Sequence, residues 1–280
     1  MNAALSPEKN SNFAVGFLFL SKPQREALQA VYRFCRHVDD IADSGHLSSA
    51  QAQRMLDFWR EEIERLYRGC PTHSISMRLA APIERFHLPS RAFSDLISGV
   101  ELDLRKNRYA TYSELEAYLY GVAVTVGLLC IEIFGYAHTP AERAREYARQ
   151  LGTAFQLTNI LRDVGADLEK GRIYIPLDEM AQAGYREEDL LRREHSPALE
   201  AVLARQYERA KLCYRRARNV LDAQDRVSMM PAEAMARVYE SILENIRAEG
   251  YRVFFRRPSV STLSKVRLAA SAWAYCHGIV

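Results

Sequence analysis

Two pairs of aspartates with the same spacing are the clearest chemical signal in the sequence. Asp39 and Asp43 lie four residues apart, and Asp163 and Asp167 repeat that interval further along the chain. Residues three or four apart, continued at seven and eleven, lie on one face of an α-helix. Each pair therefore extends into a longer polar stripe, and the two stripes consist of Tyr32, Arg36, Asp39 and Asp43, and of Gln156, Asn159, Asp163 and Asp167.

The other sides of both predicted helices are largely apolar, so each stripe is expected to face a cavity rather than bulk water. Several carboxylates that face one cavity repel one another unless cations lie between them. Carboxylate and amide oxygens suit Mg²⁺, which binds one or two protein carboxylates together with substrate phosphates. The stripes therefore predict a polyphosphate ligand bound through Mg²⁺, with Arg36, Arg162 and Arg172 as direct phosphate donors.

Each stripe alone has a simpler interpretation. The run DDIAD is typical of a solvated helix end, and Arg36 can pair with Asp39 or Asp40 within the same helix. Asn159 can be a hydrogen-bonded amide in the core. The occurrence of two matching stripes on two apolar helices favours the metal site over these interpretations.

Other metal and nucleotide motifs do not fit the sequence. A di-iron bundle needs two Glu-x-x-His motifs, and the chain has one, Glu84 and His87, close before Pro89. No Cys and His spacing suits zinc, and neither a G-x-G-x-x-G nor a P-loop sequence is present. A Gly-x-Ser-x-Gly nucleophile motif is also missing.

The elements that must hold the stripes are predicted to be helices throughout. Apolar residues recur at helical spacing, no alternating strand pattern persists, and Gly and Pro are few. We expect one all-α domain over residues 1–280 with about eight to ten helices. The expected helices cover residues 21–43, 48–69, 90–107, 111–135, 139–171, 196–224, 231–255 and 261–276.

The composition is that of a soluble globular protein. Hydrophobic residues make up 48% and charged residues 26%, and the formal net charge of +3 does not suggest a nucleic-acid partner. The five cysteines are scattered without a Cys-x-x-Cys pair, which is typical of reduced thiols and predicts a cytoplasmic location. The most apolar stretch, residues 117–131, is shorter than a membrane span and is predicted to be a helix buried on nearly all sides.

Four segments resemble the squalene/phytoene synthase family of head-to-head prenyl transferases. They are YRFCRHVDDIAD at 32–43, YLYGVAVTVG at 118–127, QLTNILRDVGADLEKGRIYIP at 156–176 and YRVFFRR at 251–257. The resemblance extends from about residue 13 to residue 257. It implies an all-α isoprenoid synthase fold, also called the class I terpenoid synthase fold, with a central cavity and three Mg²⁺ ions between two aspartate-rich helices.

The resemblance also implies roles for individual residues. Asp39 and Asp43 match the first aspartate motif, with Asp40 as a helper, and Asn159, Asp163 and Asp167 match the second motif. Positions near the diphosphates are matched by Tyr32, Arg36, Gln156, Arg162, Arg172, Tyr174, Tyr239 and Arg256. The lining of the prenyl pockets is matched by Phe13, Tyr118, Val122, Val126 and Gly127.

The family reaction fits these residue types. Diphosphate leaves one allylic substrate, the alkene of the second substrate attacks the carbocation, and loss of a proton closes a cyclopropane. The protein must bind the leaving group electrostatically and must keep water from the cation. The apolar stretch at 118–129 suits a wall of such a cavity, and tyrosine faces can stabilise positive charge.

Within the family, the phrases FLFLSKPQREALQAVYRFCR and TVGLLCIEIFGY are most similar to presqualene diphosphate synthases of the bacterial hopanoid pathway. This similarity implies that two farnesyl diphosphates are joined, that the reaction stops at the cyclopropyl diphosphate without NADPH, and that partner enzymes convert the product to squalene. The alternatives are a phytoene or dehydrosqualene synthase of carotenoid biosynthesis, and a squalene synthase that completes the reduction with NADPH.

Two further hypotheses concern roles beyond this chemistry. A non-catalytic assembly factor on the same fold should have lost metal carboxylates, and both pairs are intact here. The segment 250–267 mixes five basic residues with two phenylalanines and could rest on an anionic membrane, peripheral to its inner face. The competing interpretation, a packed final helix whose arginines face water or the diphosphates, is the one that the sequence favours.

Overall fold

The computed structural model describes residues 12–43 and 46–279, and the side chains of residues 12–14 lie outside that description. Apart from one isolated bridge between Arg108 and Ile173, the described residues form helices and loops without a sheet. The prediction of an all-α fold is therefore confirmed. The helices are η2 (Asn12–Phe19), α1 (Lys22–Asp43), α2 (Ser49–Tyr67), α3 (Ser74–Phe86), α4 (Ser90–Arg105), α5 (Tyr112–Leu119), η3 (Tyr120–Val124), α6 (Thr125–Phe134), α7 (Ala141–Glu169), α8 (Leu177–Gln182), α9 (Glu187–Leu191), α10 (Pro197–Val220), η4 (Ala223–Asp225), α11 (Met230–Ala248) and α12 (Thr262–Cys276).

Capping residues in the sequence set where several helices begin. Ser48 accepts a hydrogen bond from the backbone N–H of Gln51, whose side chain bonds back, so α2 starts with a capping box. Thr111 caps α5 and Ser196 caps α10, in each case by accepting from a backbone N–H three residues on. These polar residues satisfy N–H groups that otherwise lack partners at a helix start.

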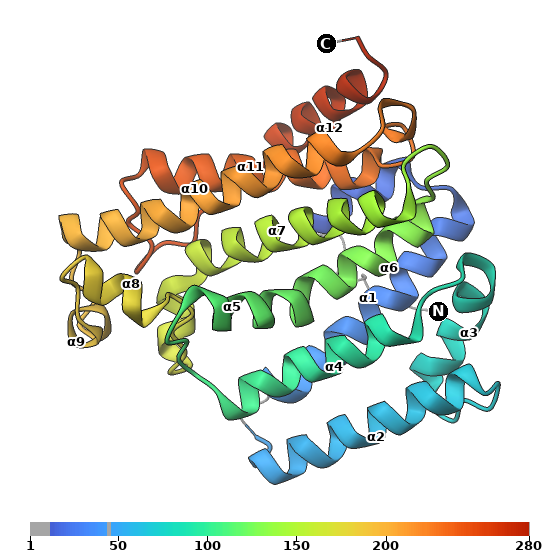
Figure 1. Ribbon diagram of the computed structural model, residues 1–280, viewed down its shortest axis with the longest axis horizontal. Coiled ribbons are helices and arrows are strands. Elements are labelled where there is room, and N and C mark those ends of the chain that lie inside the picture. Colours follow the sequence, from blue (N-terminus) through green and yellow to red (C-terminus); the bar gives the residue numbers. More distant parts are fainter. Residues whose placement is uncertain (1–11, 44–45, 280) are drawn as a thin grey trace.

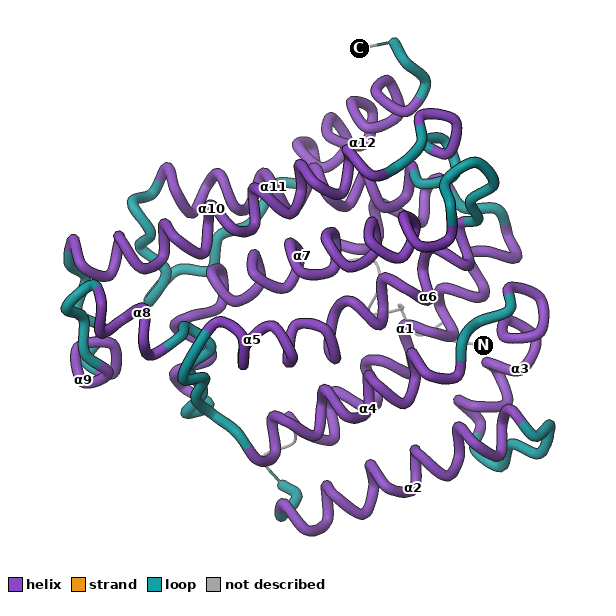
Figure 2. The backbone as a smooth tube through the Cα atoms, in the orientation of Figure 1, coloured by secondary structure: helices purple, strands orange, loops and turns teal. Residues whose placement is uncertain are grey.

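Helix α7 occupies the middle of the bundle (Figure 1). It contacts α10 and α11 on one side and α5, η3 and α6 on the other. Helices α1 and α4 follow beyond α6, α2 lies at one edge, and α12 lies at the opposite edge against α11 (Figures 1 and 2). The long helix that carries the second polar stripe is thus surrounded, with 15 buried residues along its length.

The predicted helix at 111–135 is divided by one π-helical turn. Residues Tyr120–Val124 form this turn, and the Thr125 hydroxyl donates to the Gly121 carbonyl at 2.6 Å. Gly121 lies so close to Gly99 of α4 that a Cβ atom on it would come within 2.5 Å of the Gly99 Cα. The turn therefore brings the backbones of this helix and α4 together, and π-turns of this kind often lie at functional sites.

The helix Tyr112–Phe134 is long and apolar enough to cross a membrane, judged by length and composition alone. Only half of its most apolar window is buried, which is less than the sequence analysis predicted. The reason is that one face, including Val122, Val126 and Cys130, borders an internal cavity instead of protein. The helix contacts α4 and α7, so its apolar character is that of a wall inside the bundle.

Two other differences from the expected helices matter for the site. The described residues form twelve α-helices, more than the eight to ten expected, because α3, α8 and α9 lie outside the expected ranges and the 111–135 segment is divided. The helix predicted to reach Phe255 ends at Ala248, since Gly250 and Tyr251 have φ angles of 64° and 56°. Residues 249–261 form a non-helical segment, here named the strap, that joins α11 to α12.

Candidate active site

A cavity of about 790 Å³ lies between α1, α4, α6, α7 and α11, and the strap forms part of its rim. One end is lined by both carboxylate stripes and the other end by apolar side chains. The structure therefore brings together two helices that are far apart in the sequence. The predicted site residues that line this cavity are Tyr32, Arg36, Asp39, Asp43, Tyr118, Val122, Val126, Gly127, Gln156, Asn159, Arg162, Asp163, Asp167, Arg172, Tyr174 and Tyr239.

The first stripe is tied to the end of α7 through Asp43. Its two carboxylate oxygens accept hydrogen bonds from Arg172 Nη1 at 2.6 Å and from Lys170 Nζ at 2.7 Å. Burial alone would raise the pKa of Asp43, but these two cations hold it below its ordinary value. One turn back, Asp39 accepts from Arg36 Nη1 at 3.2 Å. Burial and the neighbouring Asp43 raise the pKa of Asp39 to about 6.

The second stripe is held in a similar way. Asp163 accepts from Arg162 Nε at 2.8 Å and from Arg257 Nε at 2.7 Å. These hydrogen bonds outweigh the effect of burial and lower the pKa of Asp163. One turn on, burial and the Asp163 charge raise the pKa of Asp167 to about 7, although Lys170 and Arg172 act in the opposite direction. Both stripes thus contain one carboxylate that is stabilised by arginine and one that is poorly stabilised as an anion.

Short-range anchors fix where the cations at this end of the cavity lie. Gly171 has a φ of 70°, which lets the chain turn after α7 so that the Arg172 N–H reaches the Asp167 carbonyl at 2.9 Å. The Ile173 N–H then donates to the Asn107 carbonyl at 2.9 Å, beside the single bridge between Arg108 and Ile173. Arg172 is therefore positioned by the backbone on both sides of it.

The residues present fit Mg²⁺. Asn159 donates its amide to the Gln156 side chain at 3.1 Å, which leaves its buried Oδ1 atom without a hydrogen-bond partner. An unpartnered amide oxygen on the same helix face as the Asp163 and Asp167 carboxylates is a donor set that a hard cation prefers. Among the described residues, no group of three His, Cys, Asp or Glu side chains is close enough to hold a metal by itself. This agrees with metal binding that is shared between the two helices and a phosphate ligand.

The charge repulsion predicts a measurable pH dependence for the metal-free protein. A pKa of about 7 for Asp167 in the folded state lies above the unfolded value, so its stabilising contribution is complete below about pH 4 and is lost as the pH rises through 7. Asp167→Asn removes the charge. We expect it to raise the Tm of the metal-free protein by several degrees at pH 8 and by much less at pH 5.

Thermal unfolding in EDTA at the two pH values checks this expectation. Excess Mg²⁺ serves as the internal control, because the cation should stabilise the wild-type chain at pH 8 and have less effect on Asp167→Asn. An equal change in Tm at pH 5 and pH 8 would contradict the argument from charge repulsion.

Two predicted site residues with described side chains do not line the cavity. Asp40 pairs with Arg36 at 2.7 Å and its side chain is 54% exposed, so the helper role has no support in this geometry. Arg256 pairs with Glu249 at 3.4 Å and is 77% exposed. Arg257, the next residue, lines the cavity instead: its side chain is 67% exposed, but its guanidinium donates to Asp163. The side chain of Phe13 lies outside the described residues.

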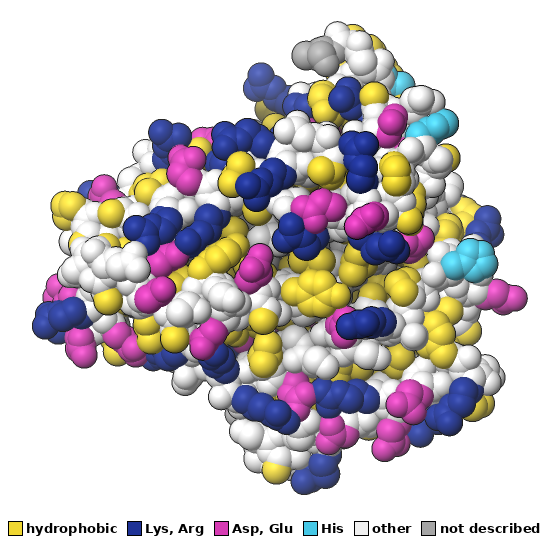
Figure 3. Space-filling view, in the orientation of Figure 1, with side chains coloured by type: hydrophobic (Ala, Val, Ile, Leu, Met, Phe, Trp, Pro, Cys, Tyr) yellow, Lys and Arg dark blue, Asp and Glu magenta, His cyan; other side chains and the backbone are white. Residues whose placement is uncertain are grey.

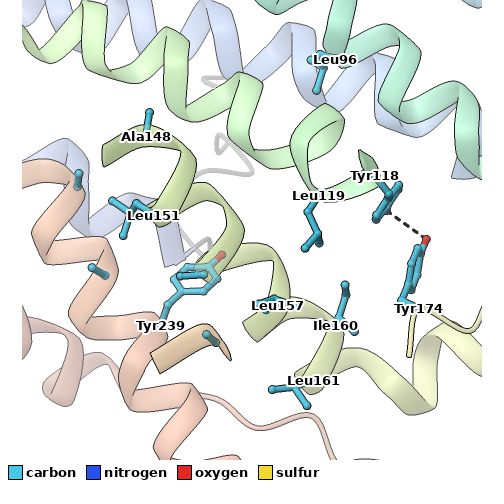
Figure 4. Packing of buried hydrophobic residues seen from close by; sticks show 14 of the residues in the cluster. Leu96, Tyr118, Leu119, Ala148, Leu151, Leu157, Ile160, Leu161, Tyr174 and Tyr239 are labelled. Carbon is cyan, nitrogen blue, oxygen red and sulfur yellow. Dashed lines mark hydrogen bonds between the residues drawn. The ribbon is translucent and has the colours of Figure 1, made fainter. Parts of the chain in front are cut away.

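Sequence reasoning missed one acidic residue in the cavity. Asp103 on α4 accepts a hydrogen bond from the Tyr118 hydroxyl at 3.1 Å and from the Tyr174 hydroxyl at 2.9 Å. The two tyrosines also bond to each other at 3.3 Å, with their rings stacked (Figure 4). Burial raises the pKa of Asp103 while Arg172 and both hydroxyls lower it. A signal existed in the sequence, since Leu96, Val100 and Asp103 share one helical face that lines the cavity.

Cationic side chains were also missed, namely Lys170, Arg257 and Lys265. Lys170 and Arg257 contact the carboxylates described above, and Lys265 comes from the first turns of α12. Together with the predicted arginines, they give the carboxylate end of the cavity a set of donors that suits phosphate oxygens.

The apolar end of the cavity follows α7 toward its N-terminus. Val122, Val126 and Cys130 line one wall, and Ala148 and Leu151 of α7 line the other (Figure 4 shows the α7 side chains). Gly127 was expected to admit a substrate chain. A Cβ atom there would lie 3.0 Å from the Ala148 carbonyl, so its smallness also allows α6 and α7 to pack closely.

Comparisons with known proteins identify relatives of this chain. The family model of squalene/phytoene synthase matches residues 7–264. The chloroplastic phytoene synthase of Narcissus pseudonarcissus is 36% identical over 96% of this chain, and the chain spans 63% of that protein's length. Further phytoene synthases match at 34–36% identity.

Solved structures give the same fold. A crystal structure of squalene synthase HpnC from Alicyclobacillus acidocaldarius is 30% identical with a TM-score of 0.78, covering 87% of this chain and 91% of that one. A dehydrosqualene synthase in complex with a ligand is 27% identical with a TM-score of 0.85, covering 97% and 94%. The predicted isoprenoid synthase fold is confirmed by these likenesses. Among sequence relatives, the phytoene synthases favour the carotenoid alternative over the presqualene diphosphate reading.

Proposed function

The chain belongs to the squalene/phytoene synthase family, and on that premise we propose that it condenses two geranylgeranyl diphosphates head to head to form phytoene. The observation that carries the head-to-head condensation is the pair of carboxylate stripes on α1 and α7 that face each other across one cavity with Arg36, Arg162 and Arg172 beside them. The choice of phytoene as product is supported by the relatives that match at 34–36% identity.

The cavity has room along α7 for an extended prenyl chain. Its lining runs along α7 from Asp163 to Ala148, which are fifteen residues apart, or about 22 Å at 1.5 Å per residue. The part of this span near Asp163 would hold the diphosphate and Mg²⁺, and the rest would hold the hydrocarbon. The choice of a C20 over a C15 substrate therefore rests on the phytoene synthase relatives.

The residues of the chain divide the chemical tasks. When bound, Mg²⁺ would neutralise the diphosphate and make it a better leaving group. Asp39, Asp43, Asp163, Asp167 and Asn159 would hold the metal, and the arginines would donate hydrogen bonds to phosphate oxygens. The apolar wall excludes water from the allylic cation after diphosphate leaves.

Tyr118 and Tyr174 lie in the cavity lining together with Asp103. The two tyrosines direct both hydroxyls at the Asp103 carboxylate. Their rings stack on each other with centroids 4.9 Å apart, and Tyr174 also stacks on Tyr109, so this packing fixes where the two hydroxyls lie. No described side chain is assigned as the base, and the released diphosphate is a suitable proton acceptor. Phytoene formation requires no reductant, whereas the expectation from the sequence tied the absence of NADPH to a presqualene diphosphate product.

A C15 reaction is the second candidate. It is favoured by the likeness to the HpnC squalene synthase and the dehydrosqualene synthase, with TM-scores of 0.78 and 0.85. In that case two farnesyl diphosphates would give presqualene diphosphate, and partner enzymes would convert it to squalene for hopanoids.

One experiment separates these candidates. The protein is incubated with farnesyl or geranylgeranyl diphosphate and Mg²⁺, with and without NADPH, and products are identified by mass spectrometry. We expect kcat/KM for the C20 substrate to exceed that for the C15 substrate by about tenfold, since one isoprene unit adds five carbons of buried apolar surface. A C15 preference with a cyclopropyl diphosphate product would support the second candidate. Failure to release diphosphate from either substrate would overturn both.

A further inference from the structure

Helix α12 carries bulky apolar side chains on its outer face. Leu263, Val266 and Trp273 are 71%, 57% and 45% exposed, and their spacing places them with Ala270 along one side of the helix. The inner face is lined by small residues, since Ala269, Ala272 and Cys276 are the buried ones. A soluble monomer normally has the opposite arrangement, with large apolar residues inside.

The inner face of α12 already has its partner. Arg237 of α11 donates to the Ser271 hydroxyl at 2.7 Å, and the guanidinium groups of Arg226 and Arg237 lie over the Tyr275 ring. Helix η2 also contacts α12, and its Leu18 is 67% exposed. The outer stripe is therefore not a core face that awaits another described element.

The charged residues of α12 and of the chain just before it, from residue 250 on, are basic, although Arg256 pairs with Glu249. Residues 250–280 contain five Lys or Arg and no Asp or Glu. Arg256 is 77% exposed, and Arg267 on α12 is exposed beside the apolar stripe. Hydrophobic and basic side chains lie next to each other over α12 at the top of Figure 3. Apolar stripes flanked by cations suit the boundary of an anionic lipid bilayer.

The position of α12 relative to the cavity also favours a lipid bilayer as the partner of this face. Lys265, in the first turns of α12, lines the cavity together with Arg257, Pro258 and Ser259 of the strap. Leu263 and Val266, on the same turns, point outward. The helix that would lie on a membrane therefore also contributes a side chain to the cavity lining.

From these observations we propose that the outer face of α12 docks on an anionic lipid surface, with Leu263, Val266 and Trp273 in the headgroup boundary. Docking would hold the cavity, to whose lining α12 contributes Lys265, close to a bilayer that can dissolve an apolar product. The sequence analysis favoured a packed final helix. The structure favours membrane contact instead, because the bulky apolar residues of this helix are exposed and the buried ones are small.

The wild-type chain offers a direct probe of this contact. It has two tryptophans, and Trp59 is 1% exposed whereas Trp273 is 45% exposed. Vesicles of phosphatidylglycerol and phosphatidylcholine should shift the emission of Trp273 to shorter wavelength, and Trp273→Phe should remove that shift. The emission shift should be smaller on pure phosphatidylcholine, which has no net negative charge for the basic residues to bind. It should also be smaller at high salt, which screens that attraction. No shift on anionic vesicles would overturn the proposal.

Co-sedimentation with the same vesicles tests the stripe itself. Leu263→Glu/Val266→Glu should lower the partition coefficient by about tenfold or more, since two apolar side chains are lost from the boundary. Met55→Glu/Met77→Glu on α2 and α3, which are 37% and 54% exposed in the wild type, is the matched control and should bind as the wild type does. Equal binding by both double variants would contradict docking through α12.

Two further measurements keep this test separate from the proposed function. Size-exclusion chromatography with light scattering would show whether the apolar stripe of α12 instead joins two copies of the chain. A concentration-dependent dimer that is lost in Leu263→Glu/Val266→Glu would overturn lipid docking. Turnover of detergent-dispersed substrate by this variant should equal the wild-type rate. Vesicle binding is measured without substrate, so its result is independent of which prenyl diphosphate is used.

Discussion

Asp163→Asn is expected to lower the rate of diphosphate release by about 10³-fold or more, because it removes a charge at the point where the second stripe meets the cavity. The wild-type carboxylate is held by Arg162 Nε at 2.8 Å and by Arg257 Nε at 2.7 Å. In the proposed complex, these arginines would donate to phosphate oxygens, and the Asp163 carboxylate would help to hold Mg²⁺. Asparagine keeps the shape of the side chain but cannot supply the charge.

Asp39→Asn should have an effect of the same order, since Asp39 occupies the matching position on α1. Its neighbour Asp40 provides the control. Asp40 lies on the same helix and also pairs with Arg36, but it does not line the cavity and is 54% exposed. We expect Asp40→Asn to retain turnover within about threefold, because an exposed ion pair contributes little.

Single-turnover release of diphosphate, measured over a range of Mg²⁺ concentrations, distinguishes these outcomes. The two cavity variants should need more Mg²⁺ than the wild type, and Asp40→Asn should not. Comparable losses in Asp39→Asn and Asp40→Asn would show that the stripe acts through overall charge rather than through a metal site. Full turnover by Asp163→Asn would contradict the metal assignment.

The parts of the site that could be predicted from sequence are those set by helical periodicity. Asp39 and Asp43, and Asn159, Asp163 and Asp167, each lie within one regular helix, so their spacing alone fixes a common face. Because each face is polar on an otherwise apolar helix, burial against a cavity follows from the same pattern. The all-α fold rests on the same signal, repeated along most of the chain.

The parts that sequence reasoning missed depend on contacts between distant segments. Asp103 is a single acid near the end of α4, and its role becomes visible only when Tyr118 and Tyr174 arrive from two other elements. The choice between Arg256 and Arg257 depends on a strap that has no periodicity. The positive φ angles at Gly250 and Tyr251 determine how the chain leaves α11 and therefore which arginine reaches the cavity. Such a local backbone conformation cannot be predicted from the pattern of apolar residues.

The second substitution with a large expected effect, at Gly165, acts through the strap. Gly165 on α7 lies against it so closely that a Cβ atom would come within 2.1 Å of the Phe254 carbonyl oxygen. Three residues further on, Arg257 reaches Asp163 at 2.7 Å. The absence of a side chain at Gly165 therefore lets the strap approach α7, and this approach brings the guanidinium to the carboxylate end of the cavity.

Gly165→Ala is expected to lower kcat/KM by about 10²-fold, because the strap must move away and Arg257 can no longer be held at the site of the leaving diphosphate. Alanine is the better helix former by about 1 kcal/mol, so α7 itself should not be weakened, and far-UV circular dichroism should stay unchanged. The substitution thus separates placement of the strap from helix formation.

A double-mutant cycle with Arg257→Ala tests whether Gly165 acts through this arginine. If it does, the double variant should be no slower than the worse of the two single variants, because the interaction can be lost only once. If the fold-loss in kcat/KM of the double variant equals the product of the two single losses, Gly165 supports the site in some other way, for instance through the packing of Phe254. Binding of inorganic diphosphate, measured by calorimetry with Mg²⁺ present, should weaken in parallel in both single variants. A loss of turnover in Gly165→Ala without a loss of diphosphate binding would therefore place its effect on the prenyl pocket rather than on Arg257.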